Sequence, residues 1–79
     1  MTARDLLEDL ATRLVDDPEA VRIEEVDEDG ELVLKLHVAE DDRGKVIGRQ
    51  GRIARALRTV MRASAARENR RVRLEIVDD

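Results

Sequence analysis

The spacing of the aliphatic residues changes several times along the chain, and these changes constrain the fold more than any other feature. In 3–15, leucine, alanine and valine recur every three or four residues, which is the period of a helix with one buried face. Thr2 can cap this helix, and the Asp-Asp-Pro run at 16–18 ends it, because proline disfavours helical geometry in the preceding residue. The sequence therefore predicts a first helix.

Two runs with strand-like alternation follow, in 20–28 and 31–39. The Asp-Gly pair at 29–30 separates them and is typical of a two-residue hairpin, in which both turn positions need a positive φ. In the first run Val26 falls out of phase, which a bulge or an edge position would explain. In the second run the leucines share one face, so His37 is expected on the other, outer face of the sheet.

Two more helices and a strand complete the pattern. A short helix is predicted through 40–47, ending at Gly48, and a longer one from near Gly51 to about Ala66. The longer helix has two faces. Its cationic face carries Arg52, Arg55, Arg58 and Arg62, and its core-facing side is expected to carry Ile53, Leu57, Val60 and Ser64. Ala54, Met61 and Ala65 widen this apolar arc. Alternation at Val72, Leu74 and Ile76 indicates a last strand. The predicted fold class is α+β, in the order αββααβ, with three helices on one face of a three-stranded sheet.

Charge is divided unevenly between the two parts of the chain. Residues 1–42 hold 15 acidic and 4 basic residues, whereas 43–79 hold 11 basic and 4 acidic ones. Of the 15 basic residues, 13 are arginine, whose forked guanidinium suits phosphate and stacks on base planes. This asymmetry favours a basic face for anions within an acidic remainder. Charge alone, however, does not distinguish such a face from a solvated helix surface.

Composition excludes several classes of function. The chain has no cysteine and one histidine, which argues against a zinc site and against a cysteine or Ser-His-Asp nucleophile. The paired carboxylates are explained by helix ends and turns, so we predict no enzyme, no metal and no cofactor. No apolar run approaches the ~20 residues of a membrane span. We therefore expect a cytoplasmic protein, with residues 1–79 forming one domain.

The segment 44–53 is the part of the sequence most indicative of function. Gly48 and Gly51 bracket two polar residues between two predicted helices, so the chain can approach a ligand closely there. Unpaired amides at the start of the third helix, together with its dipole, favour phosphates. The cations expected around this turn are Lys45, Arg49, Arg52 and Arg55, and the aliphatic wall beside it is expected to contain Val46, Ile47 and Ile53.

This segment, read as Val-Ile-Gly-Arg-Gln-Gly-Arg-Ile at 46–53, resembles the GXXG signature of KH domains. The αββααβ order resembles their type II, bacterial arrangement. With the Gly-Lys before the signature and the final strand at 72–76, the whole chain is similar to the small bacterial KH proteins of the KhpA type. The expected fold is therefore a type II KH fold.

The resemblance also implies a function and a set of residues. It implies binding of single-stranded RNA with little sequence selectivity, a loop that clamps about four nucleotides, and roles in RNA-level regulation. The clamp falls on Gly48, Arg49, Gln50 and Gly51, and the groove on Val46, Ile47 and Ile53. Gln50 departs from loops with two basic residues and leaves one cation in the clamp. The implied protein partner is a second copy or a related Jag (KhpB) protein.

One alternative stays open at this point. The apolar arc of the third helix is broad, and Ala54, Ala63 and Ala65 are small and easily approached. These features also fit a dimerising KH adaptor that acts mainly through protein contacts. A single four-nucleotide footprint implies modest affinity, so a dimer is expected in either case.

Overall fold

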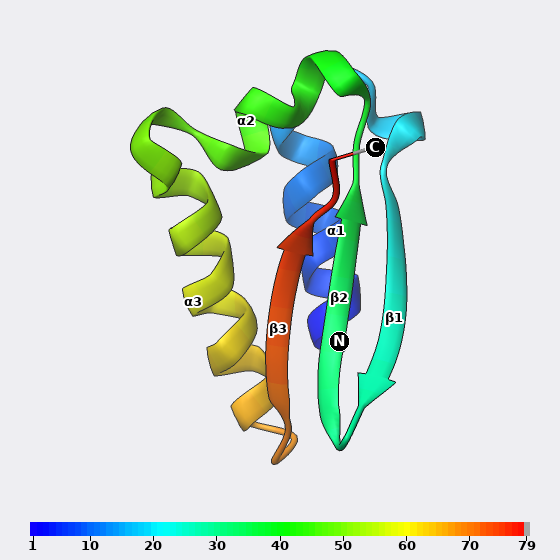
Figure 1. Cartoon of the computed structure of the whole chain (residues 1–79), viewed down its shortest axis with the longest axis vertical. Coiled ribbons are helices and arrows are strands. Elements are labelled where there is room, and N and C mark those ends of the chain that lie inside the picture. Colours follow the sequence, from blue (N-terminus) through cyan, green and yellow to red (C-terminus); the bar gives the residue numbers. More distant parts are fainter. Residues whose placement is uncertain (79) are drawn as a thin grey trace.

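A three-stranded sheet carries the helices on one of its faces (Figure 1). In the computed structural model, which describes residues 1–78, the elements are α1 (Ala3–Leu14), β1 (Arg22–Glu28), β2 (Glu31–His37), α2 (Arg43–Ile47), α3 (Arg52–Ala66) and β3 (Arg71–Ile76). Short 3-10 turns occupy Pro18–Ala20, Glu40–Asp42 and Arg49–Gly51. The strand order is β1-β2-β3, with β1 antiparallel and β3 parallel to β2. The predicted α+β class and element order are confirmed.

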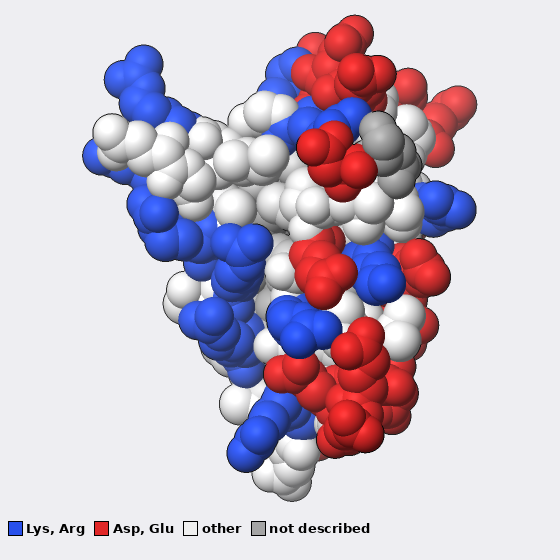
Figure 2. Space-filling model, in the orientation of Figure 1, with Lys and Arg blue, Asp and Glu red and all other residues white. Residues whose placement is uncertain are grey.

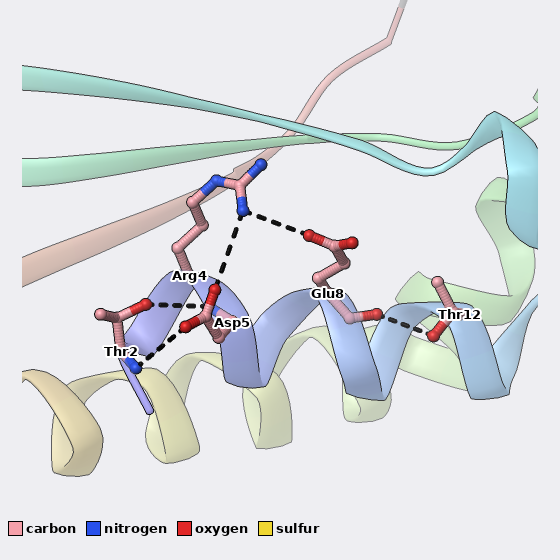
Figure 3. Close-up of polar contacts among 5 residues, drawn as sticks. All are labelled: Thr2, Arg4, Asp5, Glu8 and Thr12. Carbon is pink, nitrogen blue, oxygen red and sulfur yellow. Dashed lines mark hydrogen bonds and ion pairs between the residues drawn. The ribbon is translucent and has the colours of Figure 1, made fainter.

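Helix α1 begins as the sequence predicts, at a capping box. Thr2 Oγ1 accepts a hydrogen bond from the Asp5 amide at 3.1 Å, and the Asp5 carboxylate accepts one from the Thr2 amide at 3.4 Å (Figure 3). These bonds satisfy two amides that the helix itself leaves without partners. The buried face of α1 contains Leu7 and Ala11, both wholly inaccessible.

The hairpin forms at the predicted turn, and its register corrects one expectation. Asp29 and Gly30 have φ values of 55° and 85°, as a two-residue turn requires. Pairing runs without a break from Arg22–His37 to Glu28–Glu31, so no bulge shifts Val26. Instead Val26 pairs with Val33 on the outer face of the sheet, where Val33 is wholly buried by its neighbours. The edge position expected for this strand is confirmed.

The core lies between the sheet and the helices and is aliphatic. Its largest wholly buried side chains include Leu7 of α1, Leu34 and Leu36 of β2, Val46 of α2 and Met61 of α3. With no aromatic ring to fill the interior, these side chains bring every element against the sheet. The outer face of β2 carries His37, as predicted, with its Nε2 3.5 Å from a Glu24 carboxylate oxygen.

The buried face of α3 occupies only one side of the predicted apolar arc. The buried residues are Ala54, Leu57, Met61 and Ala65, whereas Val60 is 40% exposed. The helix is therefore rotated so that small residues face the interior. Alanine at these positions lets α3 approach β3 and α1 closely, and this packing outweighs the larger hydropathy of Val60. Ala54 and Ala65, expected to be open to a partner, are consequently covered within the chain.

Candidate nucleic-acid interface

The turn between α2 and α3 has a backbone that only glycine allows at one position. Gly48 has φ 75° and ψ 173°, and a Cβ there would lie 2.7 Å from Ile53 Cγ1. Gln50 and Gly51 follow with φ values of 57° and 73°, in the left-handed region. Gly51 has more room, because the nearest atom to its Cβ position is an Arg55 nitrogen at 3.7 Å. The turn protrudes at the upper left of Figure 1.

The amides of this turn are partly used by the turn itself. Gly51 N–H donates to Gly48 O at 3.1 Å, and Arg52 N–H donates to Arg49 O. Sequence reasoning expected unpaired amides at the start of the third helix, and for Gly51 and Arg52 the expectation is wrong. The reason is that the residues between the glycines close a 3-10 turn. In residues 1–78, the amides of Arg49 and Gln50 donate to no backbone carbonyl.

The arginines near the turn and along α3 are not neutralised by carboxylates. Within the described part of the chain no ion pair is formed by Arg49, Arg52, Arg55, Arg58, Arg62 or Arg67. Figure 2 shows lysine and arginine atoms following α3 along the left side, with the acidic atoms gathered over the opposite side and the top. This side of the molecule therefore presents uncompensated positive charge.

Lys45 does not belong to this cationic side. Its Nζ lies 3.0 Å from an Asp16 carboxylate oxygen and 3.1 Å from one of Asp42, and these carboxylates raise its pKa. Burial alone would raise the pKa of Asp42, but hydrogen bonds from the Asp17 amide and from Lys45 outweigh burial and lower it. Sequence reasoning counted Lys45 among the cations around the turn, but its ammonium is already paired with these two carboxylates.

Two arginines of α3 bind backbone carbonyls. Arg55 Nη1 donates to Gln50 O at 2.9 Å, so it contacts the turn itself. Arg58 Nε donates to Leu74 O at 3.4 Å, so it reaches across to β3. Arg49 and Arg52 make no such contact among the described residues.

Below the turn, a groove of about 280 Å³ lies between α3 and β3. It is lined by Glu31, Arg58, Arg62, Val72, Arg73 and Leu74. Sequence reasoning placed Arg58 and Arg62 on the cationic face but left them out of the site. Their spacing along α3 shows that they share a face of the helix. It does not show that β3 lies opposite them and forms the other wall of the groove.

The aliphatic wall contains two of its three expected residues. Ile47 is 39% exposed at the end of α2, and Ile53 is half-buried against Gly48. Val46 is wholly buried in the core and cannot contact a ligand, which corrects the prediction for this residue. Adjacent residues of a short helix point in different directions, and the core takes the one nearer the sheet.

Residues 1–78 contain no group of three or more His, Cys, Asp or Glu side chains that could hold a metal ion. None of their helices is long and apolar enough to span a membrane. A wider hollow of about 520 Å³ lies at the hairpin end, where carboxylates and arginines are mixed.

Comparison with known proteins gives consistent results. A family profile described as "KhpA/KhpB, KH domain" matches residues 4–76. The RNA-binding protein KhpA of Clostridium acetobutylicum is 51% identical over 74 residues, which cover 94% of this chain and 99% of that protein. The RNA-binding protein KhpA of Halalkalibacterium halodurans is 52% identical, over 92% of this chain and 96% of its own length.

A solved structure also resembles the fold. The crystal structure of Aquifex aeolicus Era Y63A superposes with a TM-score of 0.60 over 94% of this chain and 29% of that chain. Their sequence identity is 23%, so this likeness concerns the fold alone.

Proposed function

Since the chain belongs to the KhpA/KhpB family of KH-domain proteins, we propose that it binds single-stranded RNA at the turn between α2 and α3. The curated relatives are named RNA-binding proteins, and the family is not one of enzymes. The proposal extends their binding to this chain and assigns it to named residues, most of them in 47–53.

In the proposed complex, the amides of Arg49 and Gln50 donate to successive phosphates, and the guanidiniums of Arg49 and Arg52 neutralise them. The start of α3 adds the positive end of its dipole. Ile47 and Ile53 offer apolar surface to the bases. Contacts to phosphate carry no sequence information, so little base selectivity is expected for the roughly four nucleotides that the loop clamps.

One observation carries the proposal above the others. The protruding, glycine-bracketed turn lies beside arginines that no carboxylate of the described chain neutralises. An open backbone and uncompensated cations at the same place suit a sugar-phosphate chain. The same charges dispersed over the surface would not bring amides to the phosphates.

The decisive experiment reverses the charge of the loop. The double variant Arg49→Asp/Gln50→Asp should lose binding to a labelled eight-nucleotide oligouridine, measured by fluorescence anisotropy, while its circular dichroism stays native. The matched control is Arg22→Asp, since Arg22 lies exposed on β1, the strand farthest from β3 in the sheet. Unchanged oligouridine affinity in the double variant excludes the clamp.

Salt dependence provides a second measurement on the wild-type chain. Contact with three or four phosphates gives a log–log slope of roughly −2 to −3 for single strands. A much steeper slope would indicate diffuse arginine contacts instead of the clamp. Tighter binding of a duplex than of the single strand would contradict a groove that needs splayed bases.

A second proposed role is dimerisation through the exposed side of α3. Val60 is one of the few large apolar side chains that are well exposed, and Ala56 and Ala63 lie exposed beside it on the same side of the helix. The partner would be a second copy or a KhpB-like KH protein. A dimer holds two loops together and raises the effective RNA concentration at the second.

This role is tested separately from RNA binding. Val60→Glu should give a monomer in sedimentation velocity at concentrations where the wild type is dimeric, while Thr59→Glu on the neighbouring exposed position serves as the charge control. A wild-type protein that remains monomeric at high concentration, both alone and with a KhpB-like partner, removes the proposal.

A further inference from the structure

We infer that Arg55 supports RNA binding as a positioning residue: its guanidinium holds the Gln50–Gly51 peptide in one orientation and does not contact phosphate. The inference rests on the proposed function, since it assigns a role within the same loop. It replaces the role that the charge pattern suggested for Arg55.

The peptide between Gln50 and Gly51 is held at both of its polar ends. Its N–H donates to Gly48 O at 3.1 Å, and its carbonyl accepts from Arg55 Nη1 at 2.9 Å. Rotation of this peptide would break both hydrogen bonds. The first bond belongs to the turn, whereas the second ties the turn to α3.

The turn needs this support because its backbone is otherwise permissive. Gly48 and Gly51 lack the Cβ that restricts other residues, and both have positive φ values. Gln50 occupies the left-handed region with φ 57° and ψ 24°, which is unfavourable for a side chain of its type. Without Arg55, the peptide that follows Gln50 would sample other orientations and carry the adjacent amides with it.

The position of Arg55 on α3 explains why this arginine performs the role. It lies in the first turn of the helix, and helical side chains lean toward the N-terminus, which here is the loop. Its neighbours on the same face behave differently. Arg52 bonds no carbonyl or carboxylate of the described chain, and Arg58 reaches Leu74 O on β3.

Salt titration separates a positioning arginine from one that neutralises phosphate. The matched variants are Arg55→Met and Arg52→Met, each removing one charge from the same helix, and the probe is labelled eight-nucleotide oligouridine. Loss of a phosphate contact lowers the magnitude of the log–log slope by about 0.7, as expected for Arg52→Met. For Arg55→Met we expect an affinity roughly three- to tenfold lower at every salt concentration, with the slope unchanged.

A measurement on the free protein tests directly whether Arg55 holds the Gln50–Gly51 peptide. Hydrogen exchange of the Gly51 amide, followed by NMR in the free protein, should accelerate in Arg55→Met and stay at the wild-type rate in Arg52→Met. Arg55→Lys keeps a donor of similar reach and should recover part of both the exchange protection and the affinity.

The outcomes distinguish this inference from the proposed function. If the log–log slope falls in Arg55→Met as it does in Arg52→Met, Arg55 contacts phosphate and the inference is overturned. Unchanged hydrogen exchange of the Gly51 amide in Arg55→Met would also overturn it. If oligouridine binds equally well to Arg49→Asp/Gln50→Asp, the proposed function fails, and the exchange rates still decide whether Arg55 holds the turn.

Discussion

The arginines beside the turn and those on the outer face of the sheet carry the same charge in opposite surroundings. Arg73 on β3 lies 3.2–3.5 Å from carboxylate oxygens of Glu28, Glu31 and Glu75. Arg52 and Arg62 on α3 have no carboxylate partner anywhere in residues 1–78. A phosphate approaching Arg73 meets three carboxylates within ion-pair distance of the guanidinium, whereas Arg52 and Arg62 have none at that distance in residues 1–78.

The number of basic residues therefore overstates the positive charge that is available to a ligand. Eleven basic residues follow position 42, but several are neutralised. Arg43 pairs with Asp78, Arg70 with Asp27 at 3.5 Å, and Lys45 with two aspartates. The positive charge available to RNA is therefore concentrated at the turn and along α3, and position relative to carboxylates matters more than the total.

The strongest test removes the turn and leaves every arginine in place. Gly48→Ala forces a Cβ to within 2.7 Å of Ile53 in a backbone region reserved for glycine. We expect oligouridine affinity to fall at least tenfold and the unfolding free energy to fall by about 1–3 kcal/mol in urea titration. The control is Gly44→Ala in α2, where no atom lies within 4 Å of the added Cβ. Undiminished affinity in Gly48→Ala would mean that charge alone distinguishes the two regions.

A paired substitution compares the two kinds of arginine directly, since Arg62 and Arg73 line the same groove. Arg62→Gln should lower oligouridine affinity roughly two- to fivefold at 0.15 M salt and reduce the log–log slope by about 0.7. Arg73→Gln should leave both quantities unchanged, because its charge is already compensated. Equal losses in the two variants would contradict the distinction between paired and unpaired arginines.

The dependence of stability on acid pH tests the contribution of a carboxylate, Asp42. Since the folded state lowers the pKa of Asp42 below 3.8, this carboxylate stabilises the fold at higher pH, and the contribution is lost as pH falls from 3.8 through the lowered value. Asp42→Asn should therefore be less stable than the wild type near neutral pH and show a shallower loss in this acid range. The check is urea unfolding at several pH values. Parallel curves for the two proteins would remove Asp42 as a contributor.

The smallest effect on RNA binding is expected at Lys45, which precedes the turn in the sequence. Lys45→Met should change oligouridine affinity less than twofold, because Asp16 and Asp42 already hold the ammonium. Its raised pKa means that its stabilising contribution is present below 10.5 and is lost as pH rises through the higher folded value. Thermal melts at neutral pH should therefore show a lower melting temperature for this variant. A large loss of oligouridine affinity in Lys45→Met, with an unchanged melting temperature, would mean that Lys45 contacts the RNA.

Much of the fold could be predicted because local patterns determine it. The Asp29-Gly30 pair requires positive φ at both positions, and the Thr2 cap and the end of α2 at Gly48 also depend on nearby residues alone. The residues at the turn could be predicted for the same reason. Glycines three apart between two helices allow the positive φ values that a tight turn needs.

The errors arose where distant segments meet. Val46 and Ile47 are adjacent and equally apolar, but only the position of the core decides that the first is buried and the second exposed. The pairing of Lys45 could not be predicted, because Asp16 is 29 positions away along the chain. The buried face of α3 was predicted too broadly, because hydropathy counts Val60 as a core residue although the small alanines provide the close packing.

The order of helices and strands, the hairpin, the glycine turn and the excess of arginine around it follow from the sequence, because each depends on residues close together in the chain. The folded chain, by contrast, sets which arginines remain without a carboxylate partner, which aliphatic residues stay exposed, and that Arg55 reaches Gln50 O. The physical reason is that neutralisation and burial depend on neighbours in space, and these come from segments that the local pattern does not connect.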